Sequence, residues 1–282
     1  NIIKNIWKKD KMSLVETAWV ENNLSNIKLI DCSWHLPNAS RNPYQEYLNQ
    51  HLPNSLFFDL DKNSDQNTEL PHMLPSRKKW DEIVSGLGIK NEDRIIVYDN
   101  SDLISSCRLW YTFIYFGHDP KLVSVMNGGF EKWQSEKRQV TKEVIVFPKS
   151  HYISKEKKDL VKSKTQIEKN IINQEFKILD ARSKERFEGK EKEPRKGLRS
   201  GSIPNSLCLP FKQLIEKDKT FKSKEELLEI FKSVLKHDFS SKIVFSCGSG
   251  VTASVLALAY SLIDNKYNPV IYDGSWSEYG RI

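Results

Sequence analysis

The chain has 282 residues, of which 38% are apolar and 29% charged, enough for one large domain or two of ordinary size. Its formal net charge is +7, but the lysines are scattered or lie beside glutamates. Because they form no basic stripe with interleaved aromatic residues, nucleic-acid binding is not expected, whereas a basic surface suits small anionic substrates. No apolar run approaches the ~18–20 residues of a membrane span.

The first eleven residues, NIIKNIWKKDK, precede what reads as an ordinary domain start at Met12. We interpret them as a short targeting segment, an extension or a start-site artefact. They lack the apolar region of a secretory signal. The four cysteines are far apart and form no C-x-x-C pair, which suits a reducing compartment without disulfides. We therefore expect a cytoplasmic protein, or a mitochondrial one if the source is a eukaryote. No metal site and no cofactor are expected.

Four segments of the first half recur, in the same order, in the second half. The pairs are Lys28–Ser33 with Lys177–Arg182, His51–Ser55 with Ser202–Ser206, Arg94–Asn100 with Lys242–Gly248, and Ser124–Trp133 with Pro269–Tyr279. Ordered matches at nearly one spacing indicate a tandem duplication. We predict a non-catalytic domain at 12–140, a lysine-rich, glycine-free linker at 141–163 and a catalytic domain at 164–282.

Each copy alternates short apolar strands with amphipathic helical segments. This alternation predicts an α/β fold, in which a mainly parallel sheet is covered by helices on both faces. In the second copy the strands are expected near 178–181, 207–209, 243–246 and 270–272, and helices near 225–236 and 251–262.

The stretch 242–259, KIVFSCGSGVTASVLALA, carries the clearest chemical signal. A β-branched strand ends before Cys247, and a turn with Gly248 and Gly250 leads into a small-residue helix. In α/β proteins the backbone N–H groups of such a turn point at one spot and favour negative charge there. We predict a reactive thiolate at Cys247, with a merely buried small side chain as the alternative. The first copy has Asp99 at this position, so one working loop is expected.

Together these motifs resemble the two-domain rhodanese-like sulfurtransferases, from about Ser13 to the last residue. The CGSGVT loop at Cys247–Thr252 is similar to the 3-mercaptopyruvate sulfurtransferase branch, whereas thiosulfate-preferring members typically carry basic side chains there, as in CRKGVT. The DGSW segment at Asp273–Trp276 and the paired LPNS and IPNS turns match the same family. The resemblance implies two tandem rhodanese-like domains.

The resemblance also implies a reaction. Cys247 takes a sulfane sulfur from 3-mercaptopyruvate, becomes a persulfide, and passes the sulfur to cyanide or to a thiol, either a thioredoxin-like protein or a low-molecular-weight thiol. Displacements through a covalent enzyme intermediate predict ping-pong kinetics. We expect a monomer whose partners are a small anionic donor and this acceptor, and neither nucleic acid nor a membrane.

The family match assigns a donor anchor to two arginines, Arg186 and Arg195, which would hold the carboxylate of mercaptopyruvate. Guanidinium pairs with carboxylate in a planar two-bond fork that lysine cannot copy. The alternative is that both are solvated surface residues, because several other cations share their segment. The remaining substrate-binding positions implied by the family are those of the loop: Gly248, Gly250, Val251 and Thr252.

A proton relay is implied for Asp61, His72 and the loop serine Ser249. Such a chain can protonate the pyruvate enolate that leaves after sulfur transfer. The alternative is that His72 orders a loop while Asp61 caps a turn. One departure from the family is Ser202, which stands where a histidine is usual and puts the local packing in doubt; the first copy keeps His51.

Other functional classes fit the sequence less well. A cysteine-dependent phosphatase needs an arginine six residues after the cysteine, and that position is Ala253. No GxxxxGK[ST] phosphate-binding motif is present either. Within the family, a thiosulfate:cyanide sulfurtransferase is the alternative enzyme. A non-catalytic rhodanese-like binding module is the alternative of a different class, disfavoured because the cysteine loop is intact.

Overall fold

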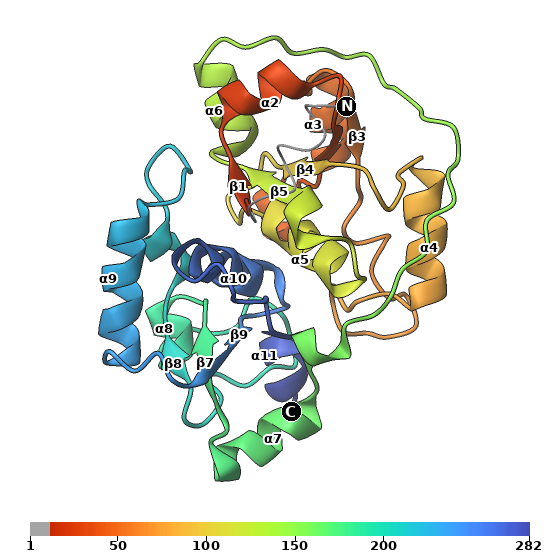
Figure 1. Cartoon of the computed structure of the whole chain (residues 1–282). Coiled ribbons are helices and arrows are strands. Elements are labelled where there is room, and N and C mark those ends of the chain that lie inside the picture. Colours follow the sequence, from red (N-terminus) through yellow and green to blue (C-terminus); the bar gives the residue numbers. More distant parts are fainter. Residues whose placement is uncertain (1–11) are drawn as a thin grey trace. The chain divides into compact units, whose positions relative to one another are not determined.

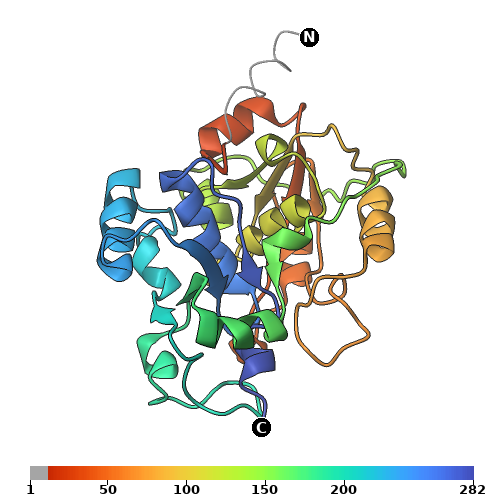
Figure 2. The same ribbon diagram turned by 60° about the horizontal axis from the view of Figure 1, so that its bottom comes forward.

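The computed structural model describes residues 12–282, so the interpretation of residues 1–11 lies outside the described part. The chain divides into two compact units, of which the first holds residues 12–66, 75–157 and 217–220 and the second holds 67–74, 158–216 and 221–282. Residues 142–157 run as an extended chain from the end of α6 (Gly129–Ser135) past α4 (Arg77–Gly86), as Figure 1 and Figure 2 show. No helix within 12–282 is long and apolar enough to cross a membrane.

The first unit is a five-stranded parallel sheet with the order β1-β5-β4-β2-β3. Helices α4 and α5 cover one face, while α2, α3 and α6 cover the other (Figure 1). The remaining bounds are β1 Leu14–Val15, α2 Thr17–Asn23, β2 Lys28–Asp31, α3 Pro43–Asn49, β3 Ser55–Phe57, β4 Ile95–Tyr98, α5 Ser106–Tyr115 and β5 Val123–Met126, with short 3₁₀ turns at Pro37–Ala39 and Pro120–Leu122.

The second unit repeats this plan with the order β6-β10-β9-β7-β8, again all parallel. Its elements are β6 Val161–Lys162, α7 Lys164–Asn173, β7 Phe176–Asp180, α8 Lys184–Phe187, β8 Leu207–Cys208, α9 Lys224–Leu235, β9 Lys242–Ser246, α10 Val251–Ile263, β10 Ile271–Tyr272 and α11 Ser275–Tyr279, with 3₁₀ turns at Lys158–Leu160 and Phe211–Leu214. Each strand occupies the place of its counterpart in the first sheet. The predicted α/β fold of two tandem domains is therefore confirmed.

The predicted elements of the second copy lie within one or two residues of the observed ones, because their signals are local. Helix α9 begins at a capping box, in which the Ser223 hydroxyl accepts from the Glu226 N–H and the Glu226 carboxylate accepts from Ser223. Helix α10 is apolar nearly all round and is buried on most of its length, packing against α9 and β9. Burial of its side chains, each contributing roughly 1.5–3 kcal/mol when large and apolar, holds the helix that follows the cysteine loop.

The paired LPNS and IPNS turns have the same backbone geometry. Asn54 and Asn205 both adopt the left-handed conformation, with φ of 61° and 64°. In each turn the following serine hydroxyl donates to the carbonyl three residues earlier, Ser55 to Leu52 at 2.8 Å and Ser206 to Ile203 at 2.6 Å. The backbone of the turn is therefore the same in both repeats, and the effect of Ser202 on side-chain packing stays a prediction.

The register brings the carboxyl ends of two neighbouring strands together in each sheet. Asp180, the last residue of β7, pairs with Ser246, the last residue of β9. In the first sheet Asp31 pairs in the same way with Tyr98. The loops that follow β9 and β4 therefore open beside the residues that follow β7 and β2, which is where parallel α/β sheets bind ligands.

The two units exchange equivalent segments. Residues 67–74 lie between β3 and α4 in the first repeat but belong to the second unit, while residues 217–220, between β8 and α9, belong to the first unit. Within the first unit, the Lys219 ammonium pairs with Asp102 at 2.9 Å and with Glu131 at 2.6 Å. No sequence pattern predicted this exchange, because it depends on contacts far apart in the chain.

Candidate active site

Cys247 lies one residue beyond β9, and the residue is 1% exposed. The backbone N–H of Gly250 donates to its Sγ at 3.1 Å. Gly250 is the N-cap of α10 and has a φ of 81°, a conformation that glycine adopts without strain. The N–H and the positive end of the helix dipole together favour negative charge on the sulfur.

The first residues of α11 hold the backbone of the loop. The Cys247 N–H donates to Ser275 Oγ at 3.2 Å, and its carbonyl accepts from the Trp276 N–H at 2.9 Å. The carbonyl of Gly248 accepts from the Ser277 N–H, also at 2.9 Å. The DGSW segment thus fixes the turn, so its N–H groups are already oriented before charge develops on the sulfur.

Two guanidinium groups approach the loop at Gly248. A Cβ atom placed on Gly248 would lie 3.3 Å from Arg186 Nη2 and 3.6 Å from Arg195 Nη1. Arg195 Nη2 also donates to Ser249 Oγ at 3.4 Å. The predicted anchor residues therefore lie together, one residue from the cysteine, and the glycine leaves room for them.

Ser249 contacts a histidine from the exchanged segment. His72 Nδ1 lies 2.9 Å from Ser249 Oγ, in a hydrogen bond whose direction depends on the histidine tautomer. His72 is 3% exposed and has a φ of 60°, a left-handed conformation in which histidine is several-fold enriched. Beside it, the Leu74 N–H donates to Asp273 Oδ2 at 2.8 Å, which holds the segment against the second unit.

Asp61, the third predicted relay residue, lies in the first unit. There both of its carboxylate oxygens accept from Trp34 Nε1, at 3.1 and 3.0 Å. The pairing of Asp61 with His72 therefore stays a prediction.

A buried ion-pair network, which no sequence pattern predicted, lies behind the arginines. Arg182 is 2% exposed and donates to both oxygens of Asp180, to Glu193 Oε1 at 2.7 Å and to the Gly201 carbonyl. Burial alone would lower the pKa of Arg182, but hydrogen bonds and charge from Asp180 and Glu193 hold that pKa above its ordinary value. Glu193 in turn pairs with Arg186 at 2.6 Å, so the network reaches the loop.

The last two loop positions contribute differently. Val251 is the first residue of α10 and is 2% exposed, so its side chain packs into the core and only its backbone borders the turn. Thr252 is the second residue of the helix and is partly exposed. Their assignment as substrate-binding residues stays a prediction.

The other three cysteines have different surroundings. Cys32 and Cys107 are fully buried, and burial raises the pKa of both thiols well above the usual range. Burial likewise raises the pKa of Cys208, which is partly exposed, to about 11. These thiols stay protonated at neutral pH and are poor nucleophiles. All four cysteines are free of disulfides.

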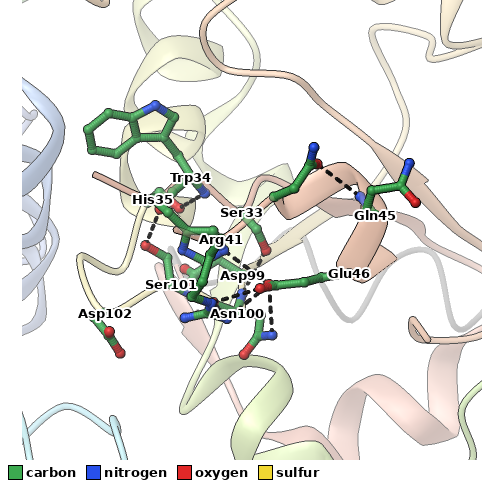
Figure 3. Close-up of polar contacts among 12 residues, drawn as sticks. Ser33, Trp34, His35, Arg41, Gln45, Glu46, Asp99, Asn100, Ser101 and Asp102 are labelled. Carbon is green, nitrogen blue, oxygen red and sulfur yellow. Dashed lines mark hydrogen bonds and ion pairs between the residues drawn. The ribbon is translucent and has the colours of Figure 1, made fainter. Parts of the chain in front are cut away.

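In the counterpart loop of the first unit, the Asp99 carboxylate accepts hydrogen bonds from the loop's own backbone; Asp99 and Ser101 are labelled in Figure 3. Asp99 is 5% exposed, and its two oxygens accept from the N–H groups of Ser101 and Ser106, each at 2.9 Å. Burial raises the pKa of Asp99, and these hydrogen bonds oppose that rise. In this loop the acceptor held by the backbone donors is a side chain of the loop itself, which gives a physical reason for expecting one working copy.

Within residues 12–282, no group of three or more histidine, cysteine, aspartate or glutamate side chains is arranged to hold a metal ion.

Comparison with known proteins finds the same two domains. A family model described as "Rhodanese-like domain" matches residues 16–136 and 163–281. "Thiosulfate/3-mercaptopyruvate sulfurtransferase 1, mitochondrial" of Arabidopsis thaliana is 38% identical over 292 residues, covering 94% of this chain and 75% of that protein. "3-mercaptopyruvate sulfurtransferase" of Rattus norvegicus is 34% identical over 275 residues, covering 95% and 91%.

Solved structures of two relatives superpose on this chain over most of its length. The crystal structure of SseA from Escherichia coli, described as a 3-mercaptopyruvate sulfotransferase, superposes with a TM-score of 0.84 at 32% identity, covering 95% of this chain and all of that one. Tum1 of Saccharomyces cerevisiae superposes with a TM-score of 0.86 at 30% identity, covering 95% and 94%. Since both halves match one domain family and the relatives named above share the pair over most of their length, this chain belongs to the two-domain rhodanese-like sulfurtransferases.

Proposed function

We propose that this enzyme transfers sulfur from 3-mercaptopyruvate, through a persulfide on Cys247, to a thiol or cyanide acceptor. The observation that carries the proposal is the convergence of Arg186 and Arg195 at Gly248, directly beside a cysteine whose sulfur accepts a backbone N–H. A carboxylate held by these arginines would place the donor's sulfur against the thiolate. The Arabidopsis and rat relatives carry this donor in their names.

The chemistry follows from these groups. The Cys247 thiolate attacks the sulfur of mercaptopyruvate, a sulfur–sulfur bond forms, and the carbon–sulfur bond breaks with its electron pair passing into the pyruvate enolate. The enolate takes up a proton at carbon and leaves as pyruvate. The acceptor thiolate then attacks the outer sulfur and restores the Cys247 thiolate. The N–H of Gly250 stabilises the Cys247 thiolate without protonating it.

The carboxylate anchor makes a prediction about donor choice. Arg195→Gly should raise KM for mercaptopyruvate by about 10- to 100-fold, because a charge-assisted hydrogen bond contributes roughly 1.5–3 kcal/mol. The increase for thiosulfate should be much smaller. Steady-state kinetics with both donors and one acceptor measure this, with the exposed Lys192→Gly as the matched control. Equal increases for the two donors would reject the anchor.

The proton relay makes a separate prediction. His72→Ala should lower kcat with mercaptopyruvate by about 10²-fold and alter its pH profile, because the enolate loses its proton source. Thiosulfate, which releases sulfite and needs no protonation at carbon, should be affected much less. The exposed His151→Ala serves as control. If His72→Ala leaves the pH profile with mercaptopyruvate unchanged, the relay is wrong.

Thiosulfate is the second candidate donor, since "Thiosulfate sulfurtransferase" of Rattus norvegicus is 35% identical over 278 residues, covering 95% of this chain and 92% of that protein. The absence of a basic side chain at Gly248 and Ser249 favours mercaptopyruvate over thiosulfate as the donor. The deciding experiment compares kcat/KM for the two donors with the same acceptor. A higher value for thiosulfate would overturn the proposed donor.

The acceptor and compartment belong to the same proposal. A thioredoxin-like protein or a low-molecular-weight thiol is the proposed acceptor, and a monomer the proposed state. The proposed compartment is the cytoplasm, or the mitochondrion if the source is a eukaryote, and the four free cysteines support a reducing environment.

A further inference from the structure

A cavity of about 340 Å³ in the second unit adjoins the catalytic loop. Its walls come from the exchanged segment 67–74, from residues 195–198 and from residues 277, 281 and 282. This volume lies within the ~300–1,000 Å³ that is typical of small-molecule sites. Since even a free water molecule takes only ~30 Å³ of liquid, a donor as small as mercaptopyruvate would not fill it. The cavity therefore suits a ligand larger than the donor.

Two walls of this cavity contact the catalytic loop directly. Ser277 donates to the Gly248 carbonyl through its N–H, at 2.9 Å, and through its hydroxyl, at 2.5 Å. From the other wall, Arg195 Nη2 donates to Ser249 Oγ at 3.4 Å. Because these two loop residues directly follow Cys247 in the chain, a ligand held in the cavity would lie beside the cysteine loop.

Backbone hydrogen bonds hold these walls together. Leu198 and Arg281 form an antiparallel bridge, and the Arg199 N–H donates to the Gly280 carbonyl at 2.9 Å. The bridge places the Arg281 side chain beside the segment that carries Arg195. Since these bonds involve only backbone atoms, a substitution of the Arg281 side chain leaves them available.

The lining of the cavity carries more positive than negative charge. It includes three cations, Arg195, Lys196 and Arg281, and one carboxylate, Glu69. Arg281 Nη1 lies 3.4 Å from a carboxylate oxygen of Glu69, so opposite charges stand side by side. An α-amino acid carries its carboxylate and its ammonium on one carbon, and can therefore pair with both of these side chains at once. The excess of cations adds attraction for the carboxylate.

We propose that this cavity binds the sulfur acceptor, and that the acceptor is a thiol with an α-amino-acid group, whose carboxylate pairs with Arg281 and Lys196 and whose ammonium pairs with Glu69. The proposal rests on the proposed function and deepens it by naming the class of acceptor. The acceptor thiol loses its proton to solvent, and its thiolate attacks the outer sulfur of the persulfide. A sulfur–sulfur bond to the acceptor forms, and the bond to Cys247 Sγ breaks with its electron pair, which restores the Cys247 thiolate.

The test removes the two cations of the cavity that are not part of the donor anchor. Lys196→Gln combined with Arg281→Gln should raise KM for L-cysteine as acceptor by about 10-fold, because two partly screened ion pairs are lost. KM for the uncharged acceptor 2-mercaptoethanol, and KM for mercaptopyruvate, should each change by less than about 3-fold. The control combines Lys190→Gln with Lys192→Gln, which removes the same charge from exposed positions outside the lining and should leave all three values unchanged.

Four results would overturn the proposal: no rise in KM for L-cysteine, an equal rise for 2-mercaptoethanol, the same rise in the control variant, or transfer to a thioredoxin-like protein but none to L-cysteine. A rise for mercaptopyruvate alone would place the donor in the cavity and contradict it as well.

A binding measurement tests the cavity without any donor. S-methyl-L-cysteine cannot accept sulfur, and its saturation-transfer NMR signal should appear with the unmodified enzyme and be lost in the variant with Lys196→Gln and Arg281→Gln. Equal signals from the two proteins would contradict the proposal. If the unmodified enzyme takes no sulfur from mercaptopyruvate, the proposed function fails separately, and this measurement still decides whether the cavity binds the amino-acid group.

Discussion

Replacing Cys247 with serine is expected to lower sulfur transfer by about 10⁴-fold or more, to the level without enzyme, for every donor. A serine hydroxyl fits the same turn but cannot carry a sulfane sulfur. No other thiol can replace it, because burial raises the pKa of Cys32 and Cys107 and keeps both protonated. Steady-state rates and the mass gained by the protein on incubation with donor provide the measurement.

The matched control for this variant is Cys208→Ser, which changes a partly exposed thiol outside the loop and should retain near-normal transfer. In the unmodified enzyme the donor should add the mass of one sulfur atom, and peptide mapping should place it on Cys247. Full activity in Cys247→Ser, or an added sulfur on another cysteine, would show that the mechanism is wrong.

Replacing Arg182 with methionine is expected to destabilise the second unit by about 3–5 kcal/mol, because it leaves the carboxylate of Asp180 buried without its guanidinium partner and leaves Glu193 with Arg186 alone. The guanidinium is 1% exposed and also lies over the Trp276 ring, 4.6 Å from its centroid. Trp276 hydrogen-bonds to Cys247, so the loop should lose order as well. Urea unfolding followed by tryptophan fluorescence measures the loss.

Arg199→Met is the control for this change, since Arg199 is exposed and also lies near the Trp276 ring, with a centroid distance of 5.5 Å. The loss of unfolding free energy in Arg199→Met should stay below about 1 kcal/mol, as for most exposed charged residues. Comparable losses in the two variants would mean that Arg182 acts through its stacking on Trp276, and that the buried ion pairs contribute little.

The elements that sequence alone predicted are those whose signals are local. The duplicated segments, the strands of the second copy and helix α9 with its capping box all depend on residues close together in the chain. The turn at Cys247 also belongs here, because a strand, two glycines and a small-residue helix are enough to specify it. The choice of Cys247 over the other cysteines followed from this pattern.

The elements that sequence did not predict depend on distant contacts. Glu193 lies in the charged run EKEPRKG, yet its side chain is buried between Arg182 and Arg186. A carboxylate in such a run gives no sign of burial until the strand that carries Asp180 is placed beside β9. The exchange of 67–74 and 217–220 between units was missed for the same reason.

The sequence by itself determined the family, the duplicated parallel-sheet fold and the cysteine at the end of β9, because periodicity and turn chemistry are written in neighbouring residues. Tertiary structure alone decided that a histidine from the first repeat meets Ser249 in the second unit. It also decided that the buried carboxylate of Glu193 pairs with Arg182 and Arg186, and that the Asp99 carboxylate accepts the backbone hydrogen bonds of its own loop. These contacts depend on strand order and register, and their energies arise only once residues far apart in the chain are packed together.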